Sequence, residues 1–361
     1  MTESAIADRV GTFCETYGLQ LPILLAPMAG ACPVALSAAV ATAGGMGACG
    51  ALLMPPEAIA AWARELRAQS NGAFQMNLWI PDPDPVRDLA HEAAVRQFLA
   101  GWGPEVPETA TEAELHDFAA HCDALIAAGP RAVSSIMGLY PPDVVARLKA
   151  QGIAWFATAT TVAEALAAED AGADVIVAQG MEAGGHRGAF DAAQAADRLV
   201  GLVALVPAVV DAVRLPVVAT GGIGDARGVA AALLLGASAV QLGTGFLRTP
   251  EAALAPTWAE GIGRARPEDT VATRAFSGRL GRSLRSAYTE AAAAPGAAVP
   301  APYPIQRNLT AAMRGAAAQG DRLEAMQAWA GQSAALARPM PAAELTTALW
   351  QEARALLRLE V

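Results

Sequence analysis

The chain has 361 residues, of which 54% are hydrophobic and 17% charged, and its formal net charge is -10. This composition excludes an intrinsically disordered chain, and the acidic balance argues against nucleic acid or an anionic membrane as a partner, because both attract basic surfaces. The length exceeds that of an ordinary single domain, but one α/β barrel with additions reaches it.

The cysteines and the apolar segments indicate a cytoplasmic protein without a membrane partner. The most apolar segment, residues 199–210, is shorter than the roughly 20 residues of a membrane span and contains Pro207, so we interpret it as a buried core helix. The chain shows no cationic, apolar-cored leader. We interpret the cysteines as buried free thiols in a reducing compartment, because they are widely spaced and form no Cys-x-x-Cys pair. They are Cys14, Cys32, Cys49 and Cys122.

Eight buried strands are predicted, most of them followed by a helix. Each is a short apolar run bounded by glycine, proline or polar residues, which is typical of parallel strands covered on both faces. In chain order the runs, the seventh including its loop, are residues 21–30, 46–53, 74–80, 132–137, 154–158, 174–178, 216–222 and 238–243. Helix starts support this division, since Thr161 and Glu164 have capping-box spacing and Asp225 has the position of an N-cap.

Two segments depart from this alternation. Residues 81–130 begin with a rigid proline-rich stretch and continue as two polar helical patterns without a strand. This is too long for an ordinary connection, so we predict an inserted helical lid above the barrel mouth. After residue 250 an Ala/Pro-rich linker leads into a largely helical tail. We therefore expect a barrel of residues 1–80 and 131–250, the lid, and a mostly helical extension over 251–361 that packs on the barrel.

Alternating strands and helices predict an α/β fold, a TIM (β/α)8 barrel, because right-handed crossovers between eight parallel strands close a barrel. An open doubly wound sheet is the alternative. Against it, the turn at residues 29–33 is not Gly-x-Gly-x-x-Gly, and no acidic residue follows the second strand in the ribose-binding position.

His186 is the candidate catalytic residue. It follows the strand at 174–178 and stands between Gly184-Gly185 and Arg187-Gly188, at the end of a barrel where active sites form. The other three histidines fall in the polar segment 81–130. The structural explanation is a buried core histidine whose hydrogen bonds are satisfied, but a histidine between Gly-Gly and Arg-Gly at a strand end favours function. For Arg187, a surface or ion-paired arginine is the better interpretation.

Glycine-bearing loops follow the seventh and eighth predicted strands, at residues 220–224 and 243–245. In barrels these loops form the common phosphate site, where backbone N–H groups meet the anion, although glycines can also serve only tight turns. Three amides, Asn77, Gln179 and Gln241, lie near strand ends at the same face, and Met28 lies near another. Amides that converge there can hydrogen-bond the heteroatoms of a flat polar ring. A ligand with both a phosphate and such a ring fits FMN better than a bare sugar phosphate. Core packing remains an equal explanation for Met28.

Several ordered motifs resemble the nitronate monooxygenases, a family once called 2-nitropropane dioxygenases. The resemblance extends from about Leu21 to Arg279 and more loosely through the tail. The motifs are Leu25-Ala26-Pro27-Met28-Ala29-Gly30, Phe74-Gln75-Met76-Asn77, Glu182-Ala183-Gly184-Gly185-His186-Arg187-Gly188, Ala219-Thr220-Gly221-Gly222-Ile223 and Phe276-Ser277-Gly278-Arg279.

The resemblance implies a TIM barrel with FMN and no metal that oxidises alkyl nitronates, such as propionate 3-nitronate, with O2 to a carbonyl compound and nitrite. It implies a catalytic role for His186, and it implies Tyr140 and Tyr303 as the best candidates for substrate contact. The implied flavin contacts are Met28, Asn77, Gln179, Gly184, Gly185, Gly221, Gly222, Gln241, Gly243 and Thr244.

The reaction itself is less specified, because FMN-dependent enoyl-ACP reductases and NADH:quinone reductases share the glycine-rich histidine motif. We therefore keep an NAD(P)H-dependent FMN reductase of enoyl-ACP or quinone type as the alternative, and a non-catalytic flavin-binding or scaffold protein as a third hypothesis. At an ordinary histidine pKa of about 6.5, His186 can either hydrogen-bond a nitro group or accept an α-proton near neutral pH. The expected partners are a small-molecule substrate and O2, and the expected oligomeric state is a monomer or homodimer.

Overall fold

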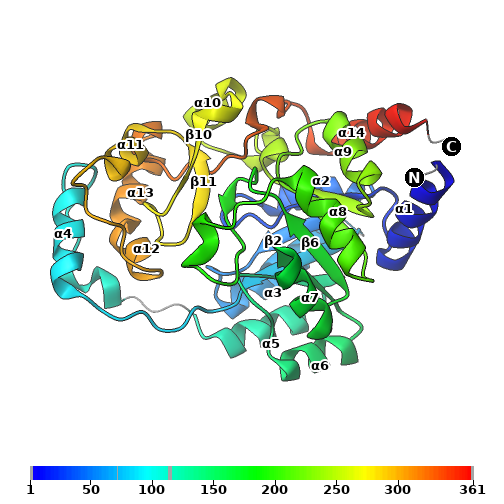
Figure 1. Ribbon diagram of the computed structural model, residues 1–361, viewed down its shortest axis with the longest axis horizontal. Helices are drawn as coiled ribbons and strands as arrows, with labels where there is room; N and C mark the ends of the chain where they lie inside the picture. The colour runs from blue at the N-terminus through cyan, green and yellow to red at the C-terminus, as the bar shows by residue number, and fades with distance from the viewer. Residues whose placement is uncertain (1–2, 71, 113–115, 359–361) are drawn as a thin grey trace.

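The computed structural model describes residues 3–70, 72–112 and 116–358. In that part, eight parallel strands follow the order β1-β9-β8-β6-β5-β4-β3-β2, and a bridge between Leu24 and Met46 joins the two ends. The ring closes and helices surround it, so the predicted TIM barrel is confirmed (Figure 1). The strands are β1 Ile23–Leu25, β2 Gly47–Gly50, β3 Phe74–Trp79, β4 Ala132–Ile136, β5 Ala154–Ala159, β6 Val175–Gln179, β8 Val217–Thr220 and β9 Ala239–Leu242.

The outer helices begin where the sequence places their caps. Asp225 and Thr161 each accept hydrogen bonds from backbone N–H groups of the following turn. The Glu164 carboxylate does not close a capping box; it accepts instead from the backbone N–H groups of Thr160 and Phe190. The helices are α2 Val34–Thr42, α3 Pro56–Gln69, α5 Phe118–Ala128, α6 Pro142–Ala150, α7 Val162–Asp170, α8 Leu202–Ala212 and α9 Ala226–Leu234.

The C-terminal helix completes the ring of helices. After β9 the chain leaves the barrel through η3 Thr244–Phe246, η4 Pro250–Ala252 and α10 Pro256–Arg264. It returns as α14 Ala342–Leu357, which contacts both α9 and α2 and buries Leu345 and Leu349 in the main core. The tail therefore occupies the place of the helix that would follow the eighth barrel strand.

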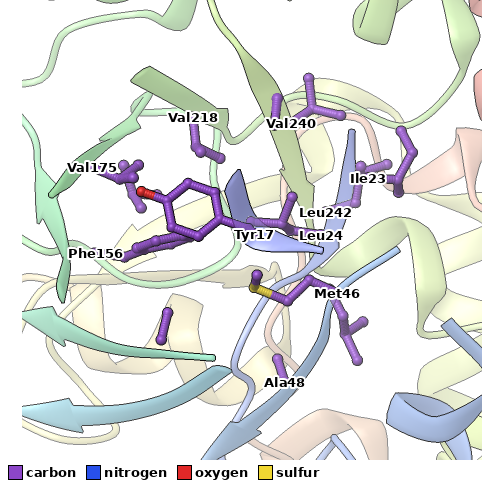
Figure 2. Close-up of a cluster of buried hydrophobic side chains, with 14 of the residues drawn as sticks. Tyr17, Ile23, Leu24, Met46, Ala48, Phe156, Val175, Val218, Val240 and Leu242 are labelled. Carbon is purple, nitrogen blue, oxygen red and sulfur yellow. The ribbon is translucent and has the colours of Figure 1, made fainter. Parts of the chain in front are cut away.

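The N-terminal helix covers the amino ends of the strands. Helix α1 spans Glu3–Tyr17, and its Tyr17 ring meets the ring of Phe156 edge-on with 5.0 Å between centroids. Figure 2 shows Tyr17 among side chains such as Val175 and Val218, which stand at the beginnings of their strands. This end of the barrel is therefore filled with apolar side chains, and any site must lie at the carboxyl ends.

A second group of helices stands beside the barrel (Figure 1). They are α4 Leu89–Leu99, η1 Glu108–Glu112, α11 Ala287–Ala293, α12 Ile305–Leu309 and α13 Ala311–Gln319, and α4 shares a core with α11, α12 and α13. In contrast, α5 contacts α3, α6 and β3 in the barrel. The division into domains stays a prediction, and this packing favours residues 81–117 as the inserted segment.

A small antiparallel sheet joins the barrel to this group. It has the order β10-β11-β7, with β7 Gly185–His186, β10 Thr270–Thr273 and β11 Gly281–Leu284. These strands carry no local signal in the sequence and were not predicted, because β7 is two residues long and β10 and β11 lack an apolar run. The remaining short elements are η2 Gln194–Ala196, η5 Pro267–Asp269, η6 Leu323–Ala325 and η7 Ala334–Leu336.

The cysteines and the apolar segment at 199–210 behave as expected. All four cysteines lie in the described residues, and each is buried with a free thiol. Helix α8 buries Leu205 and Val209 in the main core, while its Val203 is exposed. Among the described helices, none combines the length and the apolar character that crossing a membrane requires.

Candidate active site

One cavity opens at the carboxyl ends of the barrel strands. It collects residues from the ends of β1, β2, β3, β4, β5, β6, β8 and β9, and covering residues from the C-terminal extension. His186 and every residue predicted to bind the cofactor line it together: Met28, Asn77, Gln179, Gly184, Gly185, Gly221, Gly222, Gln241, Gly243 and Thr244.

The strand β7 fixes His186 against the C-terminal extension. His186 pairs with Gly281 of β11, and its Nε2 lies 2.7 Å from Oγ of Ser277. The indole rings of Trp79 and Trp329 flank the imidazole edge-on, with centroids 4.6 Å and 4.9 Å away. The ring therefore has little freedom to turn and presents its remaining face to the cavity.

Its surroundings keep the imidazole of His186 neutral. Burial, followed by the positive charges of Arg279, Arg314 and Arg307, lowers the pKa of His186 to about 3. The expectation of an ordinary pKa was therefore wrong, because the sequence does not reveal that three arginines of the C-terminal extension approach His186. An imidazole with so low a pKa is a weak base, which favours hydrogen bonding to a nitronate over removal of a carbon-bound proton.

Ser277 makes a short contact that bears on the tautomer of His186. The Ser277 hydroxyl has one hydrogen and two neighbouring acceptors, Nε2 of His186 at 2.7 Å and the carbonyl oxygen of Arg279 at 3.2 Å. When that hydrogen is directed to Nε2, the imidazole proton sits on Nδ1, and this tautomer leaves an N–H to donate to a ligand.

The three predicted amides differ in how much of each side chain is free for a ligand. Gln179 donates to the carbonyl of His186 and accepts from the N–H of Gly188, so it holds the histidine loop in place. Asn77 donates to Ser134, and Gln241 accepts from Nε2 of Gln75. Within the described residues, Asn77 Oδ1 and Gln241 Nε2 have no hydrogen-bond partner, which leaves one acceptor and one donor at the cavity.

The glycine loops after β8 and β9 offer unpaired backbone donors. Gly221 and Gly222 adopt positive φ values of 103° and 70°, which let the chain turn tightly at the cavity wall. In the described chain, the N–H groups of Gly221, Gly222, Gly243 and Thr244 have no protein acceptor. Four such donors on two adjacent loops form the kind of arrangement that binds a phosphate.

Backbone packing leaves no room for side chains around Gly184. A Cβ on Gly184 would lie 2.6 Å from the nitrogen of Gly331 and 2.9 Å from Oγ1 of Thr244. The Thr244 hydroxyl also accepts from that N–H of Gly331. Thr244 thus ties the phosphate-type loop to the segment that covers the cavity.

The structure does not bring the two predicted substrate tyrosines to the cavity. Tyr140 is buried, stacks on Phe118 and donates its hydroxyl to the carbonyl of Ser134. Tyr303 packs behind Trp79 with 5.4 Å between ring centroids, and its buried hydroxyl has no hydrogen-bond partner among the described residues.

Arg187 is buried, and no carboxylate among the described residues forms an ion pair with it. It donates to the carbonyl oxygens of Gln179, Thr160 and Arg198, and burial lowers its pKa to about 10. The interpretation of Arg187 as a surface or ion-paired residue was wrong, because three backbone carbonyl groups from separate segments accept hydrogen bonds from its guanidinium. Arg187 therefore holds the ends of β5 and β6 together behind His186.

Five further residues line the cavity but were not predicted from the sequence to belong to the site. Ser277 belongs to the motif Phe276-Ser277-Gly278-Arg279, which was quoted without a role for its serine. Trp79 could have been predicted to face the cavity, because it lies two residues after Asn77 on β3 and so on the same side of that strand. Nothing in the sequence marks the other three, because the tail has no pattern that places them over the barrel. They are Arg307, Arg314 and Trp329.

Metal ligands do not gather in the described part of the chain. No group of three or more histidine, cysteine, aspartate or glutamate side chains there is placed to hold a metal ion.

Comparisons with known proteins agree over almost the whole chain. A family model described as nitronate monooxygenase matches residues 13–352. A nitronate monooxygenase of Pseudomonas aeruginosa is 41% identical, over 95% of this chain and 99% of the relative. One of Paraburkholderia phytofirmans is 40% identical over 93% of both.

Two solved structures extend this agreement to three dimensions. A nitroalkane oxidase of Streptomyces ansochromogenes has a TM-score of 0.84 and 35% identity, covering 96% of this chain and 99% of its own. A FabK protein of Thermotoga maritima has a TM-score of 0.74 and 27% identity, covering 96% and 97%.

Proposed function

The chain belongs to the nitronate monooxygenase family, and on that premise we propose that it uses FMN to oxidise alkyl nitronates such as propionate 3-nitronate. The reaction consumes O2 and yields a carbonyl compound and nitrite. The enzyme is thus a flavin-dependent oxidoreductase that acts on a small molecule. The observation that carries the proposal is the neutral His186 in a cavity that also contains unpaired phosphate-type donors.

The donor set of the cavity fits FMN. The free N–H groups of residues 221, 222, 243 and 244 suit its phosphate, which needs no basic side chain there. Asn77 Oδ1 and Gln241 Nε2 supply an acceptor and a donor of the kind that a flavin ring requires. Met28, beside Gly243, offers an apolar surface at the same wall.

The protein's own contribution is to bind and orient the substrate and to keep water away. FMN, when bound, supplies electron transfer between the nitronate and O2. His186, held by Ser277, stays uncharged, and its one N–H can donate a hydrogen bond to an oxygen of the nitronate. Trp79 and Trp329 confine that group between apolar walls, which strengthens polar interactions by excluding solvent.

The absorption spectrum of the purified protein and its release of nitrite test the proposal. We expect flavin absorbance, and nitrite release from preformed propionate 3-nitronate that does not depend on NADH. Neutral nitroalkanes should react far more slowly, because His186 is a weak base, and His186→Asn should lower kcat/KM for the nitronate about 10- to 100-fold. Anaerobic bleaching of the flavin by NADH, without nitrite release, would instead support the reductase alternative. A yellow protein inactive in both assays would support the non-catalytic hypothesis.

Gly184 provides a test of the cofactor site alone. Gly184→Ala places a methyl group 2.6 Å from the nitrogen of Gly331, so the loop and its cover must separate. We expect the dissociation constant for FMN to rise at least about 10-fold, measured by quenching of flavin fluorescence. The control is Gly315→Ala in α13, where a Cβ would meet no atom within 4 Å. Equal FMN affinities for both variants would contradict the assignment.

Cellular setting and assembly belong to the proposal as well. We place the enzyme in the cytoplasm, which its four free thiols support, and as a monomer or homodimer. Size-exclusion chromatography with light scattering measures the oligomeric state directly.

A further inference from the structure

Gln75 is a fully buried amide on β3, one layer deeper in the barrel than the cavity. It lies two residues before Asn77 and on the same side of the strand. Asn77 lines the cavity, whereas Gln75 is not among the residues that do so. The Oε1 of Gln75 has no hydrogen-bond partner among the described residues. A buried amide that is only partly satisfied costs stability, so packing alone does not explain a glutamine at this position.

The Nε2 of Gln75 connects β3 to two other strands. It donates to the carbonyl oxygen of Leu25 on β1 over 3.1 Å and to Oε1 of Gln241 on β9 over 2.8 Å. In the ring of strands β1 and β2 lie between β9 and β3, so the second hydrogen bond crosses the barrel interior. Because Gln241 lines the cavity, Gln75 holds a residue of the cavity wall from the inside of the barrel.

The carbonyl of Leu25 fixes the direction in which both amides face. A carbonyl oxygen can only accept, so Gln75 has to turn its Nε2 toward Leu25. The same Nε2 then meets Gln241, which has to present Oε1 to it and therefore directs its own Nε2 to the cavity. If Gln241 turned over, two NH2 groups would face each other without an acceptor. A backbone atom outside the cavity thus decides that Gln241 offers a donor there.

We propose that Gln75 is a positioning residue for the flavin, because it holds the amide of Gln241 so that the donor Nε2 faces the flavin ring. This inference rests on the proposed function, which supplies the FMN. A ring gains negative charge on reduction, and a hydrogen-bond donor held against it stabilises the reduced form. The arrangement should therefore raise the reduction potential of bound FMN. Gln75 acts only through Gln241, since it does not reach the cavity itself.

The reduction potential of FMN bound to the enzyme, measured anaerobically against a reference dye, tests this role. Gln75→Met keeps the size of the side chain but removes the donor, so Gln241 is free to turn. We expect the equilibrium constant for two-electron reduction to fall about 10-fold, which makes the potential about 30 mV more negative. Gln75→Glu, which keeps the shape but offers at most one hydrogen to two acceptors, should shift the potential in the same direction.

A matched control is Gln306→Met. Gln306 is a similarly buried amide that donates to the carbonyl of Ala275 and does not line the cavity. Its loss removes a comparable buried hydrogen bond, so it should affect stability while the reduction constant stays within about 2-fold of the wild type. An equal shift in Gln306→Met would overturn the positioning role, because the effect would then be a general result of weaker packing.

A double-mutant cycle shows whether Gln75 acts through Gln241. Gln241→Met should lower the reduction constant about as much as Gln75→Met does. Adding Gln75→Met to Gln241→Met should then change it less than about 2-fold, because the residue that Gln75 holds is already gone. Additive effects would overturn the inference, and so would an unchanged potential in Gln75→Met.

This measurement needs no nitronate, so it separates the inference from the proposed function. A shifted potential with a non-additive cycle supports the role of Gln75 even if no nitronate reacts. An unchanged potential together with a raised KM for propionate 3-nitronate would overturn the inference, by assigning the free Nε2 of Gln241 to the substrate. A wild-type protein that binds no FMN would overturn the inference and the proposed function together.

Discussion

At the scale of single residues, the chemistry of the site depends on the environment of His186 more than on its identity. Two indoles flank the ring, and arginine charges add to the effect of burial, so its pKa is lowered to about 3. The sequence locates this histidine correctly in a cavity at the barrel mouth. Its protonation could not be predicted, because Arg279, Arg307 and Arg314 come from a segment whose path over the barrel no local pattern reveals.

The lowered pKa makes stability depend on pH in a defined direction. In the unfolded chain His186 takes up a proton below about pH 6.5, whereas in the folded protein it stays neutral down to about pH 3. The contribution of neutral His186 to the free energy of unfolding is therefore fully present above pH 6.5 and is lost as the pH falls toward 3. Between pH 7 and pH 5 the wild type should lose about 1 to 2 kcal/mol more unfolding free energy than His186→Gln. Urea unfolding at both pH values measures this difference, and equal losses would show that the histidine titrates normally.

At the scale of elements, one ion pair connects the inserted segment to the loop that carries Ser277. Arg279, only 1% exposed, pairs with Asp82 just after β3 and donates to the carbonyl of Ala189. The Arg279 carbonyl in turn accepts from Ser277. The position of the partner of His186 thus depends on a contact between two distant parts of the chain.

Breaking this pair should affect both stability and turnover. Asp82→Ala leaves the buried guanidinium uncompensated, so we expect a loss of about 3 kcal/mol in unfolding free energy and a lower kcat as Ser277 shifts. Asp269→Ala is the matched control, because its partner Arg266 is exposed and such pairs contribute little. Chemical denaturation and steady-state kinetics measure the two effects. A variant with unchanged kcat would show that the loop keeps its position without Asp82.

The elements that sequence analysis predicted are those with a strong local pattern. Buried apolar runs gave all eight barrel strands, although β1 retains only Ile23–Leu25 of the run at 21–30, because the following residues leave the sheet to line the cavity. Strand β7 escaped, since two residues carry no period. Its pairing with β11, some 95 positions away, exists only in the folded chain. Helix α5 was assigned to the lid for a similar reason, because nothing in its own sequence reveals that it packs against α3.

At the scale of the whole molecule, the two ends of the barrel have separate tasks. The amino end is filled by side chains that include Tyr17 of α1, and the carboxyl end holds the cavity and its glycine loops. The C-terminal extension has two roles, since α14 completes the ring of helices and α12 and α13 bring Arg307 and Arg314 over the cavity. Length and composition allowed a barrel with additions, but they could not predict that the tail would complete it.

This separation predicts a substitution that weakens the fold without altering the site. Tyr17→Ala removes a ring packed 4.8 Å from Phe13 and 5.0 Å from Phe156 between centroids, at the end of the barrel opposite the cavity. We expect a loss of about 3 to 5 kcal/mol in unfolding free energy, because the surrounding apolar side chains cannot fill the space. Tyr17→Phe keeps the ring and should cost less than about 1 kcal/mol. At a temperature where both variants remain folded, FMN affinity and kcat/KM should match the wild type within about 2-fold, because no side chain of α1 lines the cavity. A large change in FMN affinity in Tyr17→Ala would mean that the two ends are coupled through the strands.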